Sequence, residues 1–567
     1  MTWWTEGMQW RSGRWSLELR GDEFADIAVD GRVVLRSIRA VVRDADWETA
    51  DLVVDRVHAR DESLMLHVRS VGLGSAFAGV VRVEARPSQL RVLLDLESAA
   101  EFATNRTGLV VLHPPALAGT TVEVRHPNGA LTRGAFPRKI SPHQPVRDIV
   151  GLTWPIDGAT LDLAFEGDVF EMEDQRNWTD ASFKTYSRPL DLPFPYRMSR
   201  GERVRQSVTV SVAGELAPAP PASDTITLRP GGAFPEIVLG AATAPDPAPV
   251  IEPLAAGVLV ELDLRAPSWR AALARAAASG APVDVRFVGI EHTAERDAAA
   301  AALRELDIRR VGAFAASGDA AHVSDATTIA ALRAALDRVG VTAPVIGGSR
   351  SHFTELNRER HRLPTDLDGM ATTVTPLFHA TGTDQLVESV AMQRLIALQT
   401  VASAGSLPVH VGPVSLRPRF NNVATRPAPA SPATDLSEGY GAHLTGAPDE
   451  RQSAPELAAW TVASAAALAV PGVASLAYFE EWGPRGIRSS DGGDLPVAAA
   501  VRALAAETGG ELLWGESPDG LVWALGRRGS KTTILAANLD RRARSVTIDA
   551  DGQPRRVHLD PGSFRAV

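Results

Sequence analysis

The stretch 170–186, FEMEDQRNWTDASFKTY, concentrates charged and aromatic side chains that could do chemistry. Its charged residues are Glu171, Glu173, Asp174, Arg176, Asp180 and Lys184, and its aromatic residues are Phe170, Trp178, Phe183 and Tyr186. Unpaired charge is costly to bury, so these groups must be exposed or paired with one another. Two interpretations follow with similar weight: a half-buried polar network at a functional surface, or an ion-pair network at a domain junction.

A second group of polar residues follows short apolar segments in the middle of the chain. It comprises Asp263, Glu291, His292, His352, Glu355, Asn357, Arg358, His379, Arg417, Arg419, Asn421, Asn422, Glu480, Glu481 and Arg485. Carboxylates, histidines, amides and guanidinium groups in one place would suit general acid–base chemistry on a polyol.

Each candidate also has a purely structural interpretation. Glu480 is the sharpest candidate, because a glutamate directly after an uncharged strand is hard to explain by packing, although it could pair with Arg485 or Arg417. Glu355 could open a charged helix, and His379 could be a hydrogen-bonded core histidine. Arg417 and Asn421 could bind substrate hydroxyl groups or bridge to the first domain.

The segments that would position this second group alternate between strand and helix patterns. Eight apolar runs occupy 235–240, 258–264, 283–289, 311–315, 344–348, 370–376, 408–416 and 473–480. Segments of helical period lie between most of them, at 268–280, 294–306, 326–340 and 383–403. Capping signals mark their ends: Ser268 and Thr383 precede helical runs, and Gly280 and Gly340 close them.

This alternation predicts a (β/α)8 barrel, in which residues at the carboxyl ends of the strands form the active site. A doubly wound sheet is the alternative, but no glycine-rich phosphate loop follows any of the strands. After the predicted fourth strand the only carboxylate is Asp319, and none follows the seventh. That placement disfavours the common retaining glycosidases of barrel type, which carry their two carboxylates after strands four and seven.

The flanking regions are rich in strand patterns. Residues 1–224 contain short alternating segments separated by turns such as Asp30-Gly31, which predicts a β-sandwich-like domain. A Pro/Ala linker at 213–224 ends it, and a short bridging strand, TITLRP, follows. Residues 225–508 then form the barrel, and residues 509–567 return to short strands, which predicts a small C-terminal β domain.

The composition excludes several classes of function. The net charge is −10 with a pI of about 5.8, so no basic surface for nucleic acid or an anionic membrane is expected. Cysteine is absent, which removes disulfides, thiolate metal sites and a cysteine nucleophile. Residues 458–479 lack charge, but Pro471-Gly472 interrupts them, so we interpret them as a buried helix, a turn and a buried strand. A cytoplasmic protein is expected.

Metal and cofactor chemistry has little support in the sequence. There is no HExxH or HxH motif, the 13 histidines are scattered, and no GxSxG elbow is present. We therefore predict neither a metal site nor a cofactor.

Several segments together resemble the D-apionate lactonase family. They are 165–196, SHFTELNR (351–358), TPLFHA (375–380), VGPVSLRPRFN (411–421), DERQ (449–452) and YFEEWGPRG (478–486). The resemblance spans nearly the whole chain. It implies an N-terminal β domain, a barrel and a C-terminal β domain, and hydrolysis of the five-membered lactone D-apionolactone to D-apionate.

On that basis we hypothesise roles for individual residues. Glu480 is the general base, and His379 or Glu355 protonates the ring oxygen. Arg417 and Asn357 stabilise the oxyanion, and Asp263 and Asn421 contact the hydroxyl groups. Segment 170–186 closes over the barrel mouth and contributes Glu173, Asp174 or Arg176.

Two other functions remain open from the sequence. One is a glycoside hydrolase that acts on a furanoside or uronide through Glu355 and Glu480. The other is a non-catalytic carbohydrate-binding protein. In each case the partner is a small carbohydrate rather than nucleic acid or membrane, and a homo-oligomer is left open.

Overall fold

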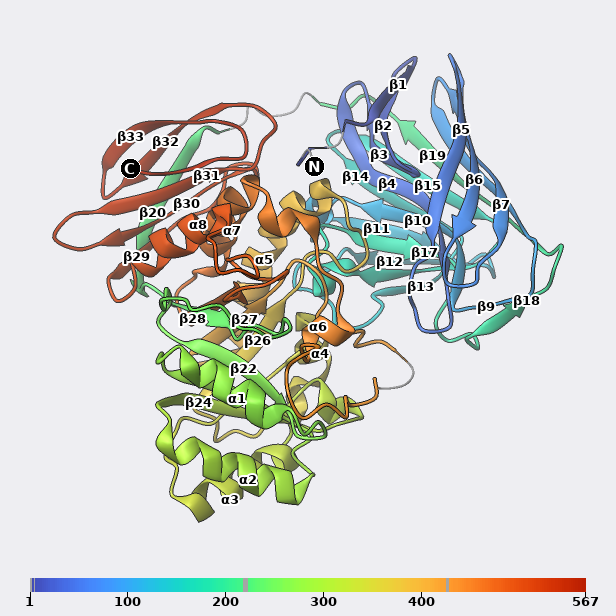
Figure 1. Ribbon diagram of the computed structural model, residues 1–567. Coiled ribbons are helices and arrows are strands. Elements are labelled where there is room, and N and C mark those ends of the chain that lie inside the picture. Colours follow the sequence, from blue (N-terminus) through green and yellow to red (C-terminus); the bar gives the residue numbers. More distant parts are fainter. Residues whose placement is uncertain (1–2, 5, 218–222, 425–427) are drawn as a thin grey trace.

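The computed structural model describes residues 3–4, 6–217, 223–424 and 428–567, so part of the predicted 213–224 linker lies outside the described residues. The N-terminal region is a sandwich of two antiparallel sheets (Figure 1). The inner sheet, which faces the rest of the molecule, has the order β1 (Met8–Ser12), β2 (Trp15–Arg20), β3 (Glu23–Val29), β4 (Arg32–Arg43), β10 (Arg106–His113), β17 (Phe183–Tyr186), β16 (Phe170–Asp174) and β13 (Val146–Ile149).

The outer sheet has the order β12 (Leu131–Ala135), β11 (Thr121–Arg125), β14 (Gly151–Ile156), β15 (Ala159–Glu166), β19 (Arg203–Ala213), β8 (Gln89–Ser98), β7 (Phe77–Arg86), β6 (Ser63–Val71) and β5 (Asp51–Arg60). Strands such as β8 alternate buried and half-exposed residues, as expected when one face packs on a core and the other meets water. A two-stranded pair, β9 (Phe102–Thr104) and β18 (Tyr196–Met198), lies beside the sandwich.

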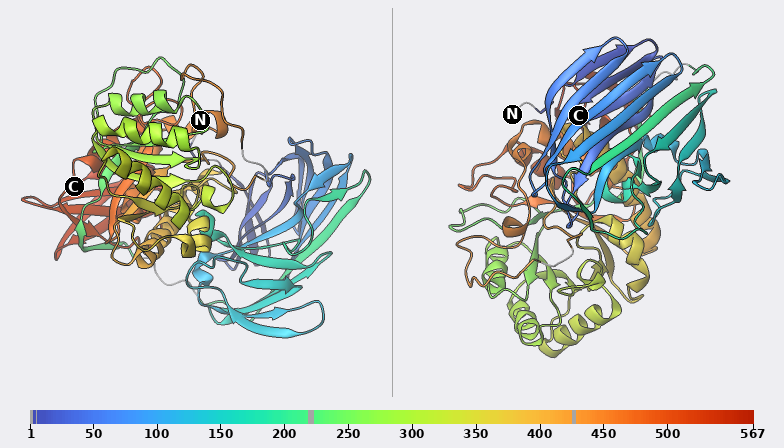
Figure 2. Two further views of the ribbon diagram at one scale, coloured as in Figure 1. Left: turned by 90° about the horizontal axis from the view of Figure 1, so that it is seen from below. Right: turned by 90° about the vertical axis from the view of Figure 1, so that its right-hand side faces the viewer.

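Strand β10 departs from this alternation because nearly all of its residues are buried. Leu109 and Val111 face the sandwich core, whereas Val110 packs with Val41 and Tyr186 on the opposite face of the sheet. That opposite face is turned toward the barrel, and the left-hand view of Figure 2 shows the sandwich beside the barrel. The inner sheet therefore forms one wall of the junction between the two regions.

The predicted barrel is confirmed. Its parallel strands are β21 (Glu236–Gly240), β22 (Val258–Asp263), β23 (Val283–Val288), β24 (Ile308–Phe314), β25 (Ile346–Gly348), β26 (Gly369–Val374), β27 (Val409–Val414) and β28 (Val473–Glu480). The amide of Val311 donates to the carbonyl of Pro344 at 2.9 Å, and a parallel bridge joins Val311 to Val345. These contacts close the sheet between β24 and β25, so the doubly wound alternative does not apply.

The helices that cover the barrel are α1 (Trp269–Ala278), α2 (Thr293–Ala302), α3 (Ala326–Val339), α4 (Phe353–Glu359), α5 (Thr383–Ala404), α6 (Ala442–Thr445), α7 (Glu456–Leu468) and α8 (Pro496–Ala505). Gly340 ends α3 in the left-handed conformation, as predicted. Ser268 directly precedes α1 at its N-cap position, as predicted, but the N-terminal signals are only partly confirmed. Ser268 makes no side-chain cap bond, and Thr383 is already the first helical residue after Gly382.

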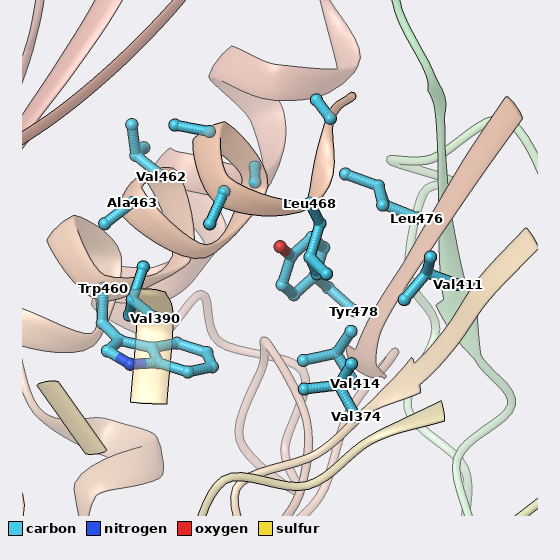
Figure 3. Close-up of a cluster of buried hydrophobic side chains, with 14 of the residues drawn as sticks. Val374, Val390, Val411, Val414, Trp460, Val462, Ala463, Leu468, Leu476 and Tyr478 are labelled. Carbon is cyan, nitrogen blue, oxygen red and sulfur yellow. The ribbon is translucent and has the colours of Figure 1, made fainter. Parts of the chain in front are cut away.

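Segment 458–479 folds as predicted, into a buried helix, a turn and a buried strand. Helix α7 is buried along nearly its whole length, and Figure 3 shows Trp460, Leu468 and Tyr478 in the core between this helix and the barrel. The Tyr478 hydroxyl donates to the Ser464 hydroxyl at 2.8 Å, which satisfies the only polar atom of that side chain. No helix in the described residues is long and apolar enough to cross a membrane.

The last sheet combines strands from two parts of the chain. Its order is β33 (Gln553–Leu559), β32 (Arg544–Ala550), β20 (Thr225–Ala233), β29 (Glu511–Trp514), β30 (Val522–Arg528), β31 (Thr533–Asn538) and β34 (Phe564–Ala566). Strand β20, the predicted bridging strand, pairs in parallel with β32 and antiparallel with β29. The chain thus passes through the C-terminal sheet before it enters the barrel.

Candidate active site

Three cavities lie on or near the carboxyl ends of the barrel strands. The largest, the interdomain cleft, has a volume of about 1000 Å³ and lies between the inner sheet of the sandwich and the barrel. The barrel-mouth chamber, about 60 Å³, lies above β21, β22 and β28. A third space of about 40 Å³, here called the β4–β10 recess, adjoins the cleft, with which it shares Arg43, Arg106 and His379. Of these three, the cleft is the one with room for a sugar lactone.

The cleft contains a histidine–carboxylate pair built by two domains. His379 lies between β26 and α5, and Asp180 lies between η2 (Gln175–Trp178) and β17. Nδ1 of His379 is 2.6 Å from Oδ2 of Asp180, and the Gln385 amide donates to the other Asp180 oxygen at 2.5 Å. Nε2 of His379 makes no hydrogen bond within the described part of the chain, and the residue lines the cleft.

Burial controls the protonation of this pair. It raises the pKa of Asp180 to about 8, and it lowers the pKa of His379 with help from the nearby Lys184 cation. The two groups are in contact, so they titrate as a unit. Below about pH 8 the pair carries two protons: one is shared between Nδ1 of His379 and Asp180, and the other is on Nε2. Above about pH 8 one of these protons is lost, and Nε2 can then accept a proton.

Aromatic rings hold His379 in place. Trp178 stacks on Phe378 with a centroid separation of 4.6 Å and an interplanar angle of 7°, and His379 meets both rings edge-on. Because Trp178 comes from the sandwich and Phe378 from the barrel, this stack also joins the two domains. Such contacts fix a ring better than apolar burial alone.

A second ion pair lies beside the first. Glu173 on β16 and Lys184 on β17 are direct cross-strand partners, 2.9 Å apart, and the Trp178 indole donates to Glu173 at 3.1 Å. Burial lowers the pKa of Lys184 to about 7. For Glu173, burial acts to raise the pKa, but Lys184, His379 and Arg358 outweigh it and the pKa is lowered.

The barrel-mouth chamber holds a separate set of groups. Both oxygens of Glu480 accept hydrogen bonds of 2.8 Å from Thr243, one from its amide and one from its hydroxyl. Burial raises the pKa of Glu480. Glu261, on β22, accepts from Arg350 and Arg419, and these cations outweigh burial and lower its pKa to about 2. Both carboxylates are therefore fully engaged by the protein.

Of the other predicted residues, the structure brings Arg417, Asn421 and Glu173 to the cleft with His379. Nε of Arg417 donates to Asp449 at 2.9 Å, and the Asn421 amide donates to the carbonyl of Asp46 at 3.3 Å. These residues form the barrel side of the cleft.

Arg358 also lines the cleft, and Arg419 and Arg485 line the barrel-mouth chamber. Five residues to which the sequence gave site roles line none of the three cavities: Asp263, Glu355, Asn357, Asp174 and Arg176. Asp263 forms an ion pair with Arg265, and Glu355 accepts from the His352 amide and the Asn422 side chain. The Asn357 amide donates to Asn177 and to the carbonyl of Ile140 across the domain junction. Asp174 and Arg176 form a fully buried ion pair that holds the loop near Pro137.

Segment 170–186 is almost wholly buried rather than half-buried. Asp174 and Arg176 belong to an ion-pair network at the domain junction, whereas Glu173, Trp178 and Asp180 reach the cleft or its recess.

Sequence reasoning did not assign site roles to Asp180, Lys184, Arg43, Arg106 or Glu261. Asp180 and Lys184 lie within the segment that the sequence singled out, so their charge among aromatic residues was a usable signal. Arg43 and Arg106 are far apart in the chain and adjacent only through strand pairing. In the described residues no group of three or more histidine or acidic side chains is arranged to hold a metal ion.

The fold is a closed (β/α)8 barrel joined to a β-sandwich, and the cleft between them contains a histidine–carboxylate pair of the kind suited to general acid–base chemistry. Residues 4–215 match the model of the D-apionate lactonase N-terminal domain, and residues 214–509 match that of the D-apionate lactonase TIM barrel domain. The chain belongs to the D-apionate lactonase family.

A curated relative agrees with this assignment. The chain is 27% identical over 556 residues to the D-apionate lactonase of Brucella anthropi, which covers 88% of this chain and 87% of the relative. Among solved structures, a GH30 endoxylanase from Clostridium papyrosolvens has a TM-score of 0.40 and 10% identity, over 60% of this chain and 98% of its own. A galactose mutarotase-like protein from Lactobacillus casei has a TM-score of 0.27 and 9% identity, over 36% and 99%.

Proposed function

We propose that this protein hydrolyses D-apionolactone to D-apionate in the interdomain cleft, with His379 as the general base and Asp180 as the residue that orients it. The observation that carries the proposal is the 2.6 Å contact between His379 and Asp180 on the wall of the cleft, which leaves Nε2 without a partner among the described residues. Membership of the D-apionate lactonase family supports the reaction and the substrate class.

The reaction balances with one water and one histidine. Nε2 of His379 accepts a proton from water as the water oxygen bonds to the lactone carbonyl carbon, and an oxyanion forms. The ring C–O bond then breaks, and Nε2 returns the proton to the departing ring oxygen. The carboxylic acid product releases its proton to solvent at neutral pH. Asp180 holds the imidazole with Nε2 toward the cleft and stabilises its protonated form.

The other cleft residues have supporting roles in this proposal. Arg417 and Asn421 contact the substrate hydroxyl groups from the barrel side, and Glu173 holds the Lys184 side chain in place beside His379. We further propose that the C-terminal sheet, with β20 inserted into it, is a small separate domain that supports the barrel and takes no part in the chemistry.

The glycosidase alternative receives no support from the geometry. It requires Glu355 and Glu480 to face one sugar ring, but Glu480 lines the barrel-mouth chamber and Glu355 lines none of the three cavities. Each is also hydrogen bonded by protein groups.

The proposal is tested by measuring acid release from D-apionolactone at constant buffer, beside a C6 aldonolactone and nitrophenyl furanosides, with and without a chelator. Opening of D-apionolactone well above the other lactone and above the spontaneous rate supports the proposal. Aglycone release without lactone opening would identify a glycosidase instead, and saturable binding without turnover would identify a binding protein.

The dependence of kcat/KM on pH should follow the ionisation of the His379–Asp180 pair. Loss of the second proton creates the base, so kcat/KM should rise with pH and level off above about 8, the value to which burial raises the pKa of Asp180. Other charged groups also face the pair, namely Lys184, Glu173, Arg43 and Arg106. The Asp180→Asn variant isolates the contribution of Asp180, because it should remove the inflection near pH 8 from the profile. A flat profile from pH 5 to 9, after subtraction of spontaneous hydrolysis, would contradict the assignment.

The Glu480→Gln variant separates the cleft from the barrel-mouth chamber. Glutamine can keep hydrogen bonds to Thr243, so the chamber should stay intact. If the chemistry takes place at His379, Glu480→Gln should lose at least tenfold less activity than His379→Ala. Equal or greater loss in Glu480→Gln, with folding unchanged, would return the role of general base to Glu480.

A further inference from the structure

Two arginines face each other across the inner sheet of the sandwich. Arg43 on β4 and Arg106 on β10 are direct cross-strand partners in the antiparallel register. Arg43 is 8% exposed and Arg106 is 2% exposed. Like charges directly opposite each other destabilise a sheet, and burial increases that cost.

Neither guanidinium group has a hydrogen-bond acceptor or a carboxylate in an ion pair within the described part of the chain. No hydrogen bond or ion pair of either side chain is found there, and the Nε atoms of both are buried without an acceptor. Other arginines on the same strand differ: Arg36 is bonded to Glu23 and Glu388, and Arg39 to Asp22. The lack of a hydrogen-bond acceptor or ion-pair partner therefore sets Arg43 and Arg106 apart from Arg36 and Arg39.

The nearby carboxylates do not neutralise this pair by contact. Glu173 is 2.9 Å from Lys184, and Asp180 is hydrogen bonded to His379 and Gln385. Burial and the neighbouring Arg106 charge together lower the pKa of Arg43 to about 10, so Arg43 is still cationic at neutral pH.

Arg106 packs against aromatic rings, and both arginines line open space. The Arg106 guanidinium lies 3.5 Å from the centroid of the Tyr186 ring and 5.3 Å from that of Trp47, an arrangement typical of a cation–π contact. Both arginines line the interdomain cleft and the β4–β10 recess, and His379 lines the same two spaces. An anion in the recess would therefore lie beside the proposed general base.

We propose that Arg43 and Arg106 bind the carboxylate of the sugar acid that lactone opening produces. The guanidinium group is suited to a planar carboxylate, which accepts two hydrogen bonds from it. The carboxylate carbon is the former lactone carbonyl carbon, so the same two cations would face the oxyanion during the reaction. The identity of the anion rests on the proposed function, whereas the existence of an anion site rests on the arginines alone.

The test is calorimetric titration with D-apionate, which needs no turnover. Its neutral counterpart is the corresponding alditol, with a CH2OH group in place of the carboxylate. Wild type should bind D-apionate at least tenfold more tightly than the alditol. Arg43→Met and Arg106→Met should each weaken D-apionate binding by roughly tenfold or more, as expected for charge-assisted hydrogen bonds, and leave alditol binding nearly unchanged.

Matched controls address folding and specificity. Arg20→Met removes another cleft-lining arginine, but one that is paired with Glu18 and Asp26, and it should leave D-apionate binding unchanged. In anion-free buffer Arg43→Met should melt at a temperature no lower than wild type, because it removes repulsion rather than a contact. Arg43→Lys provides a second variant that keeps the charge and loses the paired donors.

The outcomes are distinguishable from those of the proposed function. If wild type opens no lactone but binds D-apionate through Arg43 and Arg106, the proposed reaction fails and the anion site stands. If lactone is opened but D-apionate binding is indifferent to both substitutions, this inference is overturned. Inorganic phosphate that binds as tightly as D-apionate would also overturn the assignment to a sugar-acid carboxylate.

Discussion

Replacement of His379 by alanine should lower kcat for D-apionolactone by roughly 10²–10⁴-fold, the usual contribution of a general acid–base residue. The expectation rests on the free Nε2 in the cleft and on the Asp180 carboxylate that holds Nδ1. Because the loss affects proton transfer rather than substrate binding, KM should change much less than kcat. Steady-state rates of acid release, corrected for spontaneous opening, measure both constants.

His352 supplies the matched control for this substitution. It is also a buried histidine beside Trp178 and Phe378, but it does not line the cleft. His352→Ala should therefore keep kcat near the wild-type value. Asp180→Asn should lose activity by a factor approaching that of His379→Ala, since the imidazole loses its orienting charge. Comparable kcat losses in His352→Ala and His379→Ala would point to a packing effect instead.

The second large effect is expected on stability. Asp284→Ala should lower the free energy of unfolding by about 3–5 kcal/mol, because it leaves two buried guanidinium groups without a counterion. Asp284 lies inside the barrel on β23, where it binds Arg286 at 2.9 Å and Arg310 at 2.5 Å. All three side chains are nearly inaccessible to water. Urea denaturation followed by circular dichroism measures the change.

Asp263→Ala is the control for that variant. Asp263 forms an ion pair with Arg265 on the same barrel, but both side chains are partly exposed, and such pairs contribute about 0–1 kcal/mol. The two arginines outweigh burial and lower the pKa of Asp284, so its contribution to stability is present above the ordinary carboxyl pKa and is lost as pH falls through the native value. Equal destabilisation by the two substitutions would contradict the burial argument.

Much of the fold could be predicted from local patterns. The eight barrel strands, the four long helices between them and the helix–turn–strand at 458–479 all lie where the apolar periodicity placed them. Periodicity succeeds there because buried parallel strands and their covering helices must show it. It did not reveal that β20 joins the C-terminal sheet, since its partners in β29 and β32 lie 278 to 322 positions later in the chain.

The residues of the candidate site were harder to predict from local sequence patterns than the fold was. Strand ends suggested His379, Arg417 and Asn421, which line the cleft, but the same rule also selected Asp263, which the structure places in an ion pair outside the cleft. The rule reports where a strand ends, and it cannot report which direction the following side chain takes. Asp180 lies in another domain altogether, so no count along the barrel could pair it with His379.

By itself the sequence determined the order of sandwich, barrel and C-terminal strands, and it supplied the charged and aromatic segment that reaches the cleft. Those features follow from periodicity and composition, which are local properties of the chain. The tertiary structure decided which charges meet: His379 with Asp180, Glu173 with Lys184, and Arg43 opposite Arg106. The physical reason is that contact energies depend on distance and burial, and both are fixed only when the inner sheet packs against the barrel.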